Sequence, residues 1–271
     1  MRSILSRFGL KKEPFAKDLS VDDFYWPPHL EDARTRLRAA LKGRASVVMT
    51  GDPGTGKTFI LRAVERDLEG QPYRIEYLHN SAVNRREFYR QLCIALGLEP
   101  KSSAASLFRM ISQHIEELAS EQKIRPILLF DEAHMLVGQI LAHLPVLLNF
   151  HMDSKPFLSI VLVGLPELKE TLRRNLQSAL NGRLPVRIHL APLEPAQVAE
   201  YVHHHMRSAG ADKDIFTEEA LLMIAESTGG VMRKINILAQ QCLHTAAGKK
   251  SPLVDAPCVR DAVQRCVEAL A

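Results

Sequence analysis

The residues with the clearest chemistry form a glycine-rich loop that ends in lysine and threonine. Residues 51–58 read Gly-Asp-Pro-Gly-Thr-Gly-Lys-Thr, which fits the spacing G-x-x-x-x-G-K-[ST] in full. Glycines let backbone N–H groups turn inward around phosphate oxygens, where side chains would block them. Lys57 has the reach for β- and γ-phosphates, and the Thr58 hydroxyl suits Mg²⁺. The loop predicts a site for a nucleoside triphosphate with Mg²⁺, made by Gly51, Asp52, Pro53, Gly54, Thr55, Gly56, Lys57, Thr58 and Phe59.

Two carboxylates follow a later apolar run. Residues 127–130 are Ile-Leu-Leu-Phe, and Asp131 and Glu132 come directly after them. Many strands end in an acidic residue that only caps the next helix, so the pair is weak evidence by itself. After a phosphate-binding loop, however, the pair predicts two roles, with Asp131 in the Mg²⁺ shell and Glu132 polarising the attacking water. We therefore expect hydrolysis, with Lys57 and Glu132 as catalytic residues.

The ends of strands and the starts of helices must position these groups, and the hydrophobic pattern predicts where the strands and helices lie. Amphipathic stretches such as 103–120, with apolar residues every three or four positions, separate short apolar runs. Strands that alternate with helices predict an α/β fold with a five-stranded parallel sheet covered by helices. The expected strands are residues 45–50, 73–78, 127–131, 157–163 and 186–190.

After residue 191 only helical patterns remain. Pro195 suits the first position of a helix, and Thr217 is followed by two glutamates, as is typical of an N-cap. Two further helices are expected at about 231–247 and 257–270.

We expect three parts along the chain. An N-terminal basic arm with a first helix occupies residues 1–44 and packs on the α/β domain, a role that Trp26 suits. The phosphate-binding α/β domain covers 45–191, and a small helical lid domain covers 192–271.

Composition and charge leave the choice of partner open. The chain of 271 residues is 46% hydrophobic and 24% charged, which is ordinary for a globular protein. The net charge of +4 falls within residues 1–44, and the rest of the chain is neutral. Such mild basicity permits an anionic partner but fits a solvated basic arm equally well.

We expect a cytoplasmic protein without a membrane segment. No stretch approaches the roughly 18 uninterrupted apolar residues of a membrane span. The first ten residues are followed at once by Lys11 and Lys12, which leaves no apolar core for a signal peptide. The four cysteines show no metal-ligand spacing.

With the phosphate-binding loop, the acidic pair and the helical C-terminal part, the chain resembles an AAA+ P-loop ATPase. More narrowly, it resembles the group of ExeA-type secretion ATPases and TniB/TnsC-type transposition ATPases. The resemblance implies ATP as the nucleotide and a homo-oligomer that forms a ring or helical filament. It rests on motifs spread nearly end to end, at residues 8–10, 14–15, 147–150, 161–168 and 229–236.

The resemblance gives roles to two arginines. It implies that Arg233, at the start of a lid helix, reaches the γ-phosphate of its own subunit's ATP. It implies that Arg183 is the arginine finger that serves a neighbouring subunit, with Arg173 and Arg174 as alternatives. A guanidinium suits both roles because it donates several hydrogen bonds in a fixed plane. The alternative for each is an ordinary salt bridge.

One residue departs from the pattern of these ATPases. They often carry a polar residue, commonly glutamine, just after the glycine of the fourth strand, and here that residue is Leu165. Leucine neither orients water nor bonds phosphate. We therefore expect slow turnover, well below about 10 per second, and a long-lived ATP state.

Three jobs remain open for such an ATPase. Secretion-type relatives usually continue into a membrane span and a wall-binding domain, whereas this sequence ends after the helical lid. We therefore favour a transposition regulator that assembles on duplex DNA and recruits a transposase. The alternatives are a secretion-pathway ATPase and a nucleotide-switched scaffold with little turnover.

DNA contacts are expected after the second strand, where related ATPases line a central pore. Asn84, Arg85 and Arg86 end a polar segment that begins at Asn80. Such side chains suit phosphate contacts that do not read sequence. The alternative is that both arginines merely open a helix and face solvent.

Some conspicuous residues have simpler explanations. His203, His204 and His205 are consecutive, so on a helix they diverge by about 100° and cannot converge on one ion. We expect them on a partly exposed helix face. His134 is either a group that supports the acidic pair or a packing and capping residue, and Cys242 is expected in the core.

Overall fold

The computed structural model describes residues 2–16, 20–78, 83–174 and 178–266. It divides into two compact units. The sheet unit contains Leu30–Asp52 and Lys57–Leu190, and the helical unit contains Met1–His29, Pro53–Gly56 and Ala191–Ala271.

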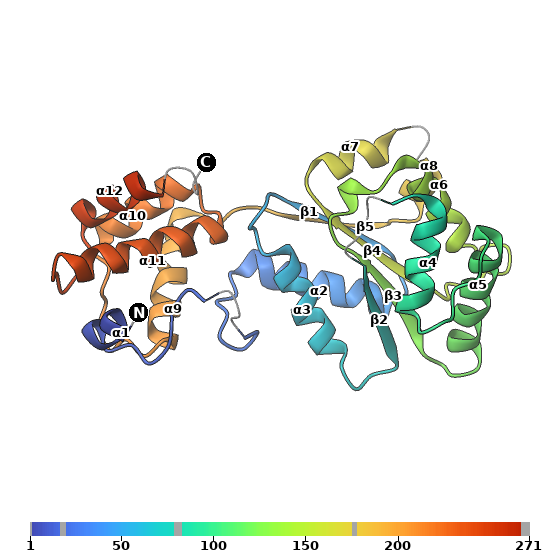
Figure 1. Cartoon of the computed structure of the whole chain (residues 1–271), viewed down its shortest axis with the longest axis horizontal. Coiled ribbons are helices and arrows are strands. Elements are labelled where there is room, and N and C mark those ends of the chain that lie inside the picture. Colours follow the sequence, from blue (N-terminus) through green and yellow to red (C-terminus); the bar gives the residue numbers. More distant parts are fainter. Residues whose placement is uncertain (1, 17–19, 79–82, 175–177, 267–271) are drawn as a thin grey trace. The chain divides into compact units, whose positions relative to one another are not determined.

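The sheet unit is built on five parallel strands in the order β2-β3-β4-β1-β5 (Figure 1). The predicted parallel sheet is confirmed, and each expected strand is present within two residues of its predicted ends. Central strands carry continuous apolar runs because helices cover both of their faces. The strands are β1 (Val47–Gly51), β2 (Tyr73–Leu78), β3 (Arg125–Phe130), β4 (Ser159–Gly164) and β5 (Val186–Leu190).

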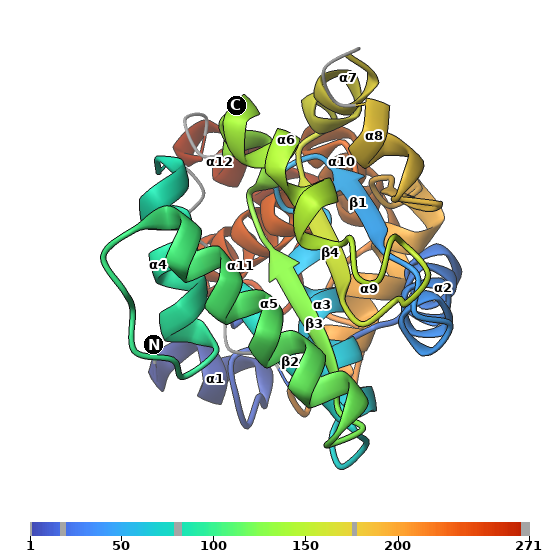
Figure 2. The ribbon, with the colours of Figure 1, turned by 90° about the vertical axis from the view of Figure 1, so that its right-hand side faces the viewer.

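Right-handed crossovers decide which helices cover which face of the sheet. The chain moves outward from β1 to the edge strand β2, and inward from β2 through β3 to β4. The helices after β2, β3 and β4 therefore share one face, and α3 (Lys57–Leu68) lies on the other with α2 (Pro28–Lys42). Figure 2 shows α4 (Arg85–Ala95) and α5 (Ala104–Ser120) side by side near β3. The first face carries α4 (Arg85–Ala95), α5 (Ala104–Ser120), the 3₁₀ turn η1 (Ala133–Met135), α6 (Gly138–Leu147), α7 (Glu167–Arg173) and α8 (Ser178–Gly182).

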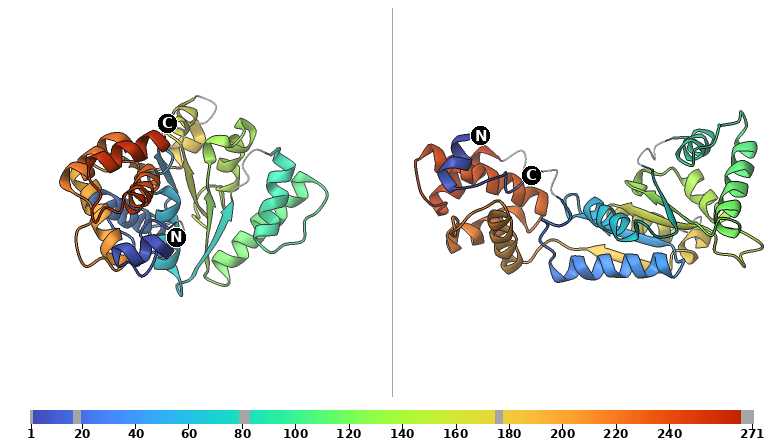
Figure 3. Two further views of the ribbon diagram at one scale, coloured as in Figure 1. Left: turned by 60° about the vertical axis from the view of Figure 1, so that its left-hand side comes forward. Right: turned by 90° about the horizontal axis from the view of Figure 1, so that it is seen from below.

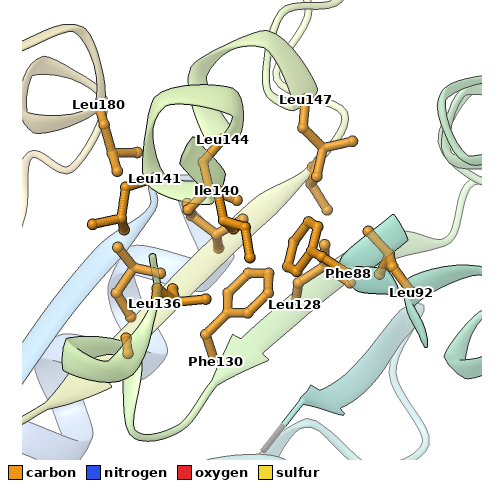
Figure 4. Close-up of a cluster of buried hydrophobic side chains, with 14 of the residues drawn as sticks. Phe88, Leu92, Leu128, Phe130, Leu136, Ile140, Leu141, Leu144, Leu147 and Leu180 are labelled. Carbon is orange, nitrogen blue, oxygen red and sulfur yellow. The ribbon is translucent and has the colours of Figure 1, made fainter. Parts of the chain in front are cut away.

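A continuous apolar core fills the space between the first face and its helices (Figure 4). Alternate residues of β3, Leu128 and Phe130, point into it, because successive strand residues face opposite sides of a sheet. Phe88 of α4 stacks on Phe130 with ring centroids 5.8 Å apart. Ile140 and Leu144 of α6 close the core from above β4. This packing fixes β3, whose end carries the acidic pair.

An ion pair joins α2 to α3 on the opposite face. Arg34 donates from Nε to Asp67 Oδ2 at 2.8 Å and from Nη2 to Asp67 Oδ1 at 2.5 Å. A bidentate guanidinium–carboxylate pair fixes geometry as well as adding energy. It therefore helps to hold α3, which starts at the phosphate-binding lysine.

The helical unit packs its helices into one bundle, with α1 (Arg2–Phe8) against α11 (Met232–Gly248) (Figure 3). Thr217 is the N-cap of α10, as predicted, and accepts a hydrogen bond from the N–H of Ala220 at 3.2 Å. Pro195 is the first residue of α9, as predicted. The other helices are α9 (Pro195–Ser208), α10 (Glu218–Thr228), α11 (Met232–Gly248) and α12 (Ala256–Arg265).

The N-terminal arm is placed differently from the prediction. Residues 1–29 group with the C-terminal helices, whereas we expected the whole of 1–44 on the α/β domain. The reason is an aromatic cluster: Phe24 packs edge-on against Trp26 at 5.0 Å and against Tyr201 of α9 at 6.4 Å between ring centroids. The Lys11 N–H also donates to Ala209 O at 2.7 Å. Trp26 thus belongs to the helical unit.

Candidate functional site

The glycine-rich loop connects β1 to α3, as the sequence predicts. In the sheet unit, Lys57 is 7% exposed and its ammonium donates to Gly51 O at 2.7 Å and Asp52 O at 2.9 Å. Thr58 and Phe59 follow in the first turn of α3. A helix N-terminus presents N–H groups and a positive dipole end to an anion. This end of α3 is therefore suited to phosphate.

Thr58 and Asp131 meet at the carboxyl edge of the sheet. Asp131 is 5% exposed, and its Oδ2 accepts a hydrogen bond from Thr58 Oγ1 at 3.1 Å. Because the hydroxyl proton points at the carboxylate, the hydroxyl lone pairs stay available on the other side. One hydroxyl and one carboxylate make a hard oxygen donor set, which fits Mg²⁺ completed by phosphate oxygens and water.

Glu132 adopts a strained backbone conformation immediately after Asp131. Its φ of +52° lies in the left-handed region, which costs a non-glycine residue about 1–2 kcal/mol. The Glu132 N–H donates to Asp131 Oδ1 at 2.9 Å, and its side chain is 56% exposed. Adjacent carboxylates thereby separate, with one buried against Thr58 and the other open to solvent.

His134 lies between Glu132 and the residue after β4. Its Nδ1 is 3.4 Å from Glu132 Oε2 and 3.4 Å from the Leu165 N–H, which donates to it. A single ring nitrogen cannot accept from Leu165 and donate to Glu132 at the same time. Leu165 occupies the position where the resemblance implies a polar side chain, and there its backbone N–H contacts His134. With Nδ1 accepting from Leu165, no hydrogen bond from this nitrogen reaches Glu132, and both roles of His134, support of the acidic pair and packing or capping, remain open.

The helical unit brings the start of α11 against the segment Pro53–Gly56. Gly54 O accepts a hydrogen bond from the Arg233 N–H at 3.3 Å. Gly54 has a φ of +85°, and a Cβ added there would lie 2.6 Å from Arg233 Cβ. Only glycine permits this approach. Within this unit the backbone of Arg233 therefore contacts Gly54 directly, while its predicted reach to the γ-phosphate stays a prediction.

Arg183 is held by an acidic residue of its own chain. It follows α8, and its Nη2 lies 2.9 Å from Asp153 Oδ2. Asp153 ends a run of three residues with positive φ, His151 at +50°, Met152 at +58° and Asp153 at +66°. Such a run is costly for L-residues and persists only where the surrounding structure fixes it. The alternative finger Arg173 instead pairs with Glu170 of its own helix at 2.8 Å.

The residues predicted to contact DNA open α4. Asn84 is the N-cap, and its Oδ1 accepts from the Glu87 N–H at 3.0 Å. Arg85 Nη1 is 2.8 Å from His143 Nε2, and Arg86 Nε donates to Ser102 O at 2.8 Å. Burial, and then the Arg85 cation, lowers the pKa of His143. Residues 80–82 of the predicted segment lie outside the described part of the chain.

The three consecutive histidines diverge, as predicted. His203 Nδ1 is 3.1 Å from Asp214, and His204 Nε2 is 3.0 Å from Asp23 O. His205 is buried against Tyr201, which differs from the expected partly exposed face. Among the described residues no group of three or more His, Cys, Asp or Glu side chains is placed to hold a metal ion.

Sequence reasoning missed Tyr77. This residue of β2 donates its hydroxyl to Asp131 Oδ2 at 2.8 Å. Partial burial, and then the hydrogen bond to Asp131, raises the pKa of Tyr77. The sequence places Tyr77 at a strand end but does not show that β2 pairs with β3, so nothing in it indicated this contact.

A parallel sheet with a phosphate loop after β1 and an acidic pair after β3 defines a P-loop nucleoside triphosphatase. A family model described as AAA domain matches residues 38–173, half of the chain, and the chain belongs to this family. General secretion pathway protein A of Aeromonas hydrophila is 32% identical over 247 residues. The match covers 90% of this chain and 45% of that protein, so the chain spans less than half of this relative.

Solved structures share the fold. Cdc6p from Pyrobaculum aerophilum superposes with a TM-score of 0.71 at 19% identity, covering 93% of this chain and 70% of that one. A Drosophila ORC chain from a complex bound to DNA gives 0.74 at 18% identity, covering 98% and 66%. The RuvB Holliday junction branch migration motor of Thermotoga maritima gives 0.62 at 17% identity, covering 94% and 73%. None of the helices within the described ranges has the length and apolar character that a membrane crossing requires.

Proposed function

We propose that this chain is a cytoplasmic ATPase that binds ATP with Mg²⁺, assembles on duplex DNA and recruits a transposase to its target. The observation that carries the ATPase part is the contact of Thr58 with Asp131 at 3.1 Å, at the end of the helix that Lys57 begins. Membership of the AAA domain family supports nucleotide hydrolysis in general. The DNA and transposase parts are finer proposals, supported by the motif resemblance.

The residues divide the chemistry between them. Lys57 leaves the carbonyls of Gly51 and Asp52 and donates to phosphate oxygens instead. Thr58 and Asp131 would hold Mg²⁺, and the ion would supply positive charge beside the phosphates. Glu132, open to solvent, accepts a hydrogen bond from the attacking water and orients it toward the γ-phosphate. Leu165 adds no polar side chain to this step, which supports slow turnover.

Arg233 and Arg183 sense the γ-phosphate from two directions. The backbone contact of Arg233 with Gly54 supports action on the subunit's own ATP. Arg183 is the finger for a neighbouring subunit, where it exchanges Asp153 for phosphate oxygens. An arginine supplied by a neighbour makes ATP part of the subunit interface, so hydrolysis loosens the oligomer. The assembly then lasts as long as its ATP, which sets how long a DNA target stays marked.

Arg85 and Arg86 supply the DNA contacts in this proposal. Both lie in the first turn of α4, where exposed guanidinium groups suit backbone phosphates. Their hydrogen bonds to His143 and Ser102 are single, so donors remain on each group. Asn84 serves as the helix cap and contributes through its position.

Nucleotide binding and turnover test the ATPase part. Glu132→Gln keeps ATP binding and loses turnover, because the amide does not polarise water. Lys57→Ala loses binding as well. Binding is measured with a fluorescent ATP analogue and turnover by phosphate release. Turnover at the wild-type rate in Glu132→Gln would refute the assignment of Glu132. A wild-type protein that binds ATP tightly but does not hydrolyse it would favour the switched scaffold.

Electron microscopy and DNA binding test the assembly part. Wild-type protein with ATP and duplex DNA forms rings or filaments, and Arg183→Ala binds ATP but does not assemble. Arg173→Ala is the matched control and assembles normally. Arg85→Ala with Arg86→Ala weakens DNA binding equally for all sequences and flattens its salt dependence. Arg90→Ala, in the same helix and paired with Glu87, is the control. A wild-type protein that stays monomeric with ATP and DNA refutes this part.

A secretion-pathway ATPase is the second candidate function. It is favoured by the 32% identity with General secretion pathway protein A over 90% of this chain. In that case turnover and assembly do not respond to duplex DNA, while the Glu132 and Lys57 variants behave as above. DNA-stimulated turnover separates the two candidates.

A further inference from the structure

The carboxylate of Asp131 is held on three sides. Its Oδ1 accepts from the Glu132 N–H at 2.9 Å, and its Oδ2 accepts from Thr58 Oγ1 at 3.1 Å and Tyr77 Oη at 2.8 Å. Of these donors, the Glu132 N–H and the Thr58 hydroxyl belong to the phosphate-loop and acidic-pair motifs. Tyr77 belongs to neither and comes from the edge strand β2.

The pairing of β2 with β3 places Tyr77 next to the end of β3, beside Asp131. β2 pairs with β3 in parallel, with Tyr77 in register with Leu129. Side chains alternate between faces along a strand, so Leu129 and Asp131 share a face and Tyr77 shares it too. That face also carries α3 and therefore Thr58. The Asp131 N–H donates to Leu78 O at 3.1 Å, which continues the pairing to the end of the strand.

Tyr77 is an exposed residue whose hydroxyl nevertheless contacts a buried carboxylate. Its side chain belongs to a residue that is 46% exposed, yet its hydroxyl turns inward to the carboxylate. An exposed tyrosine hydroxyl would otherwise bond water at no loss. The contact with Asp131 Oδ2 therefore adds a hydroxyl donor that lies outside both motifs.

We propose that Tyr77 is a positioning residue that fixes the Asp131 carboxylate for the divalent cation bound with the nucleotide. This inference rests on the proposed function, in which Asp131 and Thr58 hold that cation. Thr58 points its proton at Asp131 Oδ2 and so keeps its lone pairs for the cation. Tyr77 keeps Oδ2 in the place where it accepts that proton. Groups that orient a metal ligand in this way set metal affinity.

The Mg²⁺ dependence of nucleotide binding tests the proposal without relying on activity. Tyr77→Phe keeps the ring and removes the hydroxyl. Affinity for a fluorescent ATP analogue in EDTA should equal that of the wild type. The Mg²⁺ concentration at half-maximal enhancement of binding should rise about tenfold, the low end of the effect of losing such an orienting group. The turnover that Tyr77→Phe loses at low Mg²⁺ should return at high Mg²⁺.

Tyr73→Phe is the matched control. Tyr73 begins the same strand, and its hydroxyl accepts from Arg125 Nη1 at 3.2 Å, away from the acidic pair. This variant should keep the wild-type Mg²⁺ midpoint. An equal shift in both variants would mean that β2 acts only through its stability and would overturn the proposal.

Asp131→Asn separates this inference from the proposed function. An unchanged midpoint in Tyr77→Phe, with a large shift in Asp131→Asn, overturns the role of Tyr77 alone. If Asp131→Asn also keeps the wild-type midpoint, the assignment of Asp131 to the cation is wrong and the proposed site falls with it. A raised Mg²⁺ midpoint in both Tyr77→Phe and Asp131→Asn, with the midpoint of Tyr73→Phe unchanged, supports the proposal.

Discussion

Two adjacent glycines before α11 allow a sharp test of how Arg233 is positioned. Gly230 has a φ of +74°, and a Cβ added there would lie 1.9 Å from Leu193 O and 2.9 Å from the Leu193 N and C atoms. The Leu193 N–H also donates to Gly230 O at 2.9 Å. Gly229 has a φ of +56°, but a Cβ there would meet nothing within 4 Å. Gly229→Ala and Gly230→Ala therefore share the strain of a positive φ, and only Gly230→Ala adds a steric overlap with Leu193.

The magnitudes follow from these contacts. Alanine in the left-handed region costs about 1–2 kcal/mol, partly offset by about 0.4–1 kcal/mol from a less flexible unfolded chain. Gly229→Ala should therefore lower the free energy of unfolding by about 1 kcal/mol. In Gly230→Ala the overlap forces the backbone of Leu193 away and breaks its hydrogen bond, worth about 0.5–1.5 kcal/mol. We expect a loss of at least about 3 kcal/mol there.

The assay uses the only tryptophan of the chain. Trp26 packs against Phe24 in the helical unit, so its fluorescence during urea unfolding reports this unit. Gly230→Ala should unfold at clearly lower urea than Gly229→Ala. Because Arg233 follows three residues later, Gly230→Ala should also weaken ATP-analogue binding more than Gly229→Ala. Equal urea midpoints for the two variants would refute the reasoning.

Two further predictions concern His205 and Asp153. Burial lowers the pKa of folded His205 from its ordinary value of 6.5 to about 3. The unfolded chain therefore binds more protons below pH 6.5, and stability, fully present above that pH, falls as the pH drops toward 3. From pH 7.5 to 5 the wild type should lose about 2 kcal/mol that His205→Leu keeps, measured by urea titration at both pH values. In Asp153→Asn, asparagine tolerates the positive φ, so the free energy of unfolding should change by less than about 1 kcal/mol. Because this substitution releases Arg183, it should also lower the protein concentration needed for ATP-dependent assembly. Sedimentation measures this, and an unchanged threshold would count against Asp153 as the partner that Arg183 must leave.

The sequence predicted the elements that long local patterns specify. Strands 73–78 and 186–190 have the predicted ends, and Thr217 caps its helix as expected. These features depend on residues a few positions apart, where apolar runs and capping chemistry act directly. The phosphate loop and the acidic pair were predictable for the same reason, because their spacing is fixed by the strand end that carries them.

What the sequence did not predict depends on which elements become neighbours. The arm joined the helical unit because Phe24 meets Tyr201, a contact between residues far apart in the chain. Tyr77 reaches Asp131 only because β2 pairs with β3, and strand order is a property of the whole sheet. The pairing of Arg183 with Asp153 depends on the run of positive φ at residues 151–153, which no local sequence pattern predicts.

The site holds itself together by the bonds that ATP must replace. The buried ammonium of Lys57 is satisfied by the carbonyls of Gly51 and Asp52, since an unpaired buried charge would be costly. Phosphate oxygens must therefore compete with two hydrogen bonds, so part of the binding energy goes into moving Lys57. In the proposed function, Arg183 faces the same exchange with Asp153. A nucleotide that lacks the γ-phosphate offers Arg183 nothing in return for this ion pair. In the proposed function, discrimination between ATP and ADP thus follows from the ion pair that Arg183 must give up, and it makes ATP, rather than nucleotide in general, the signal for assembly.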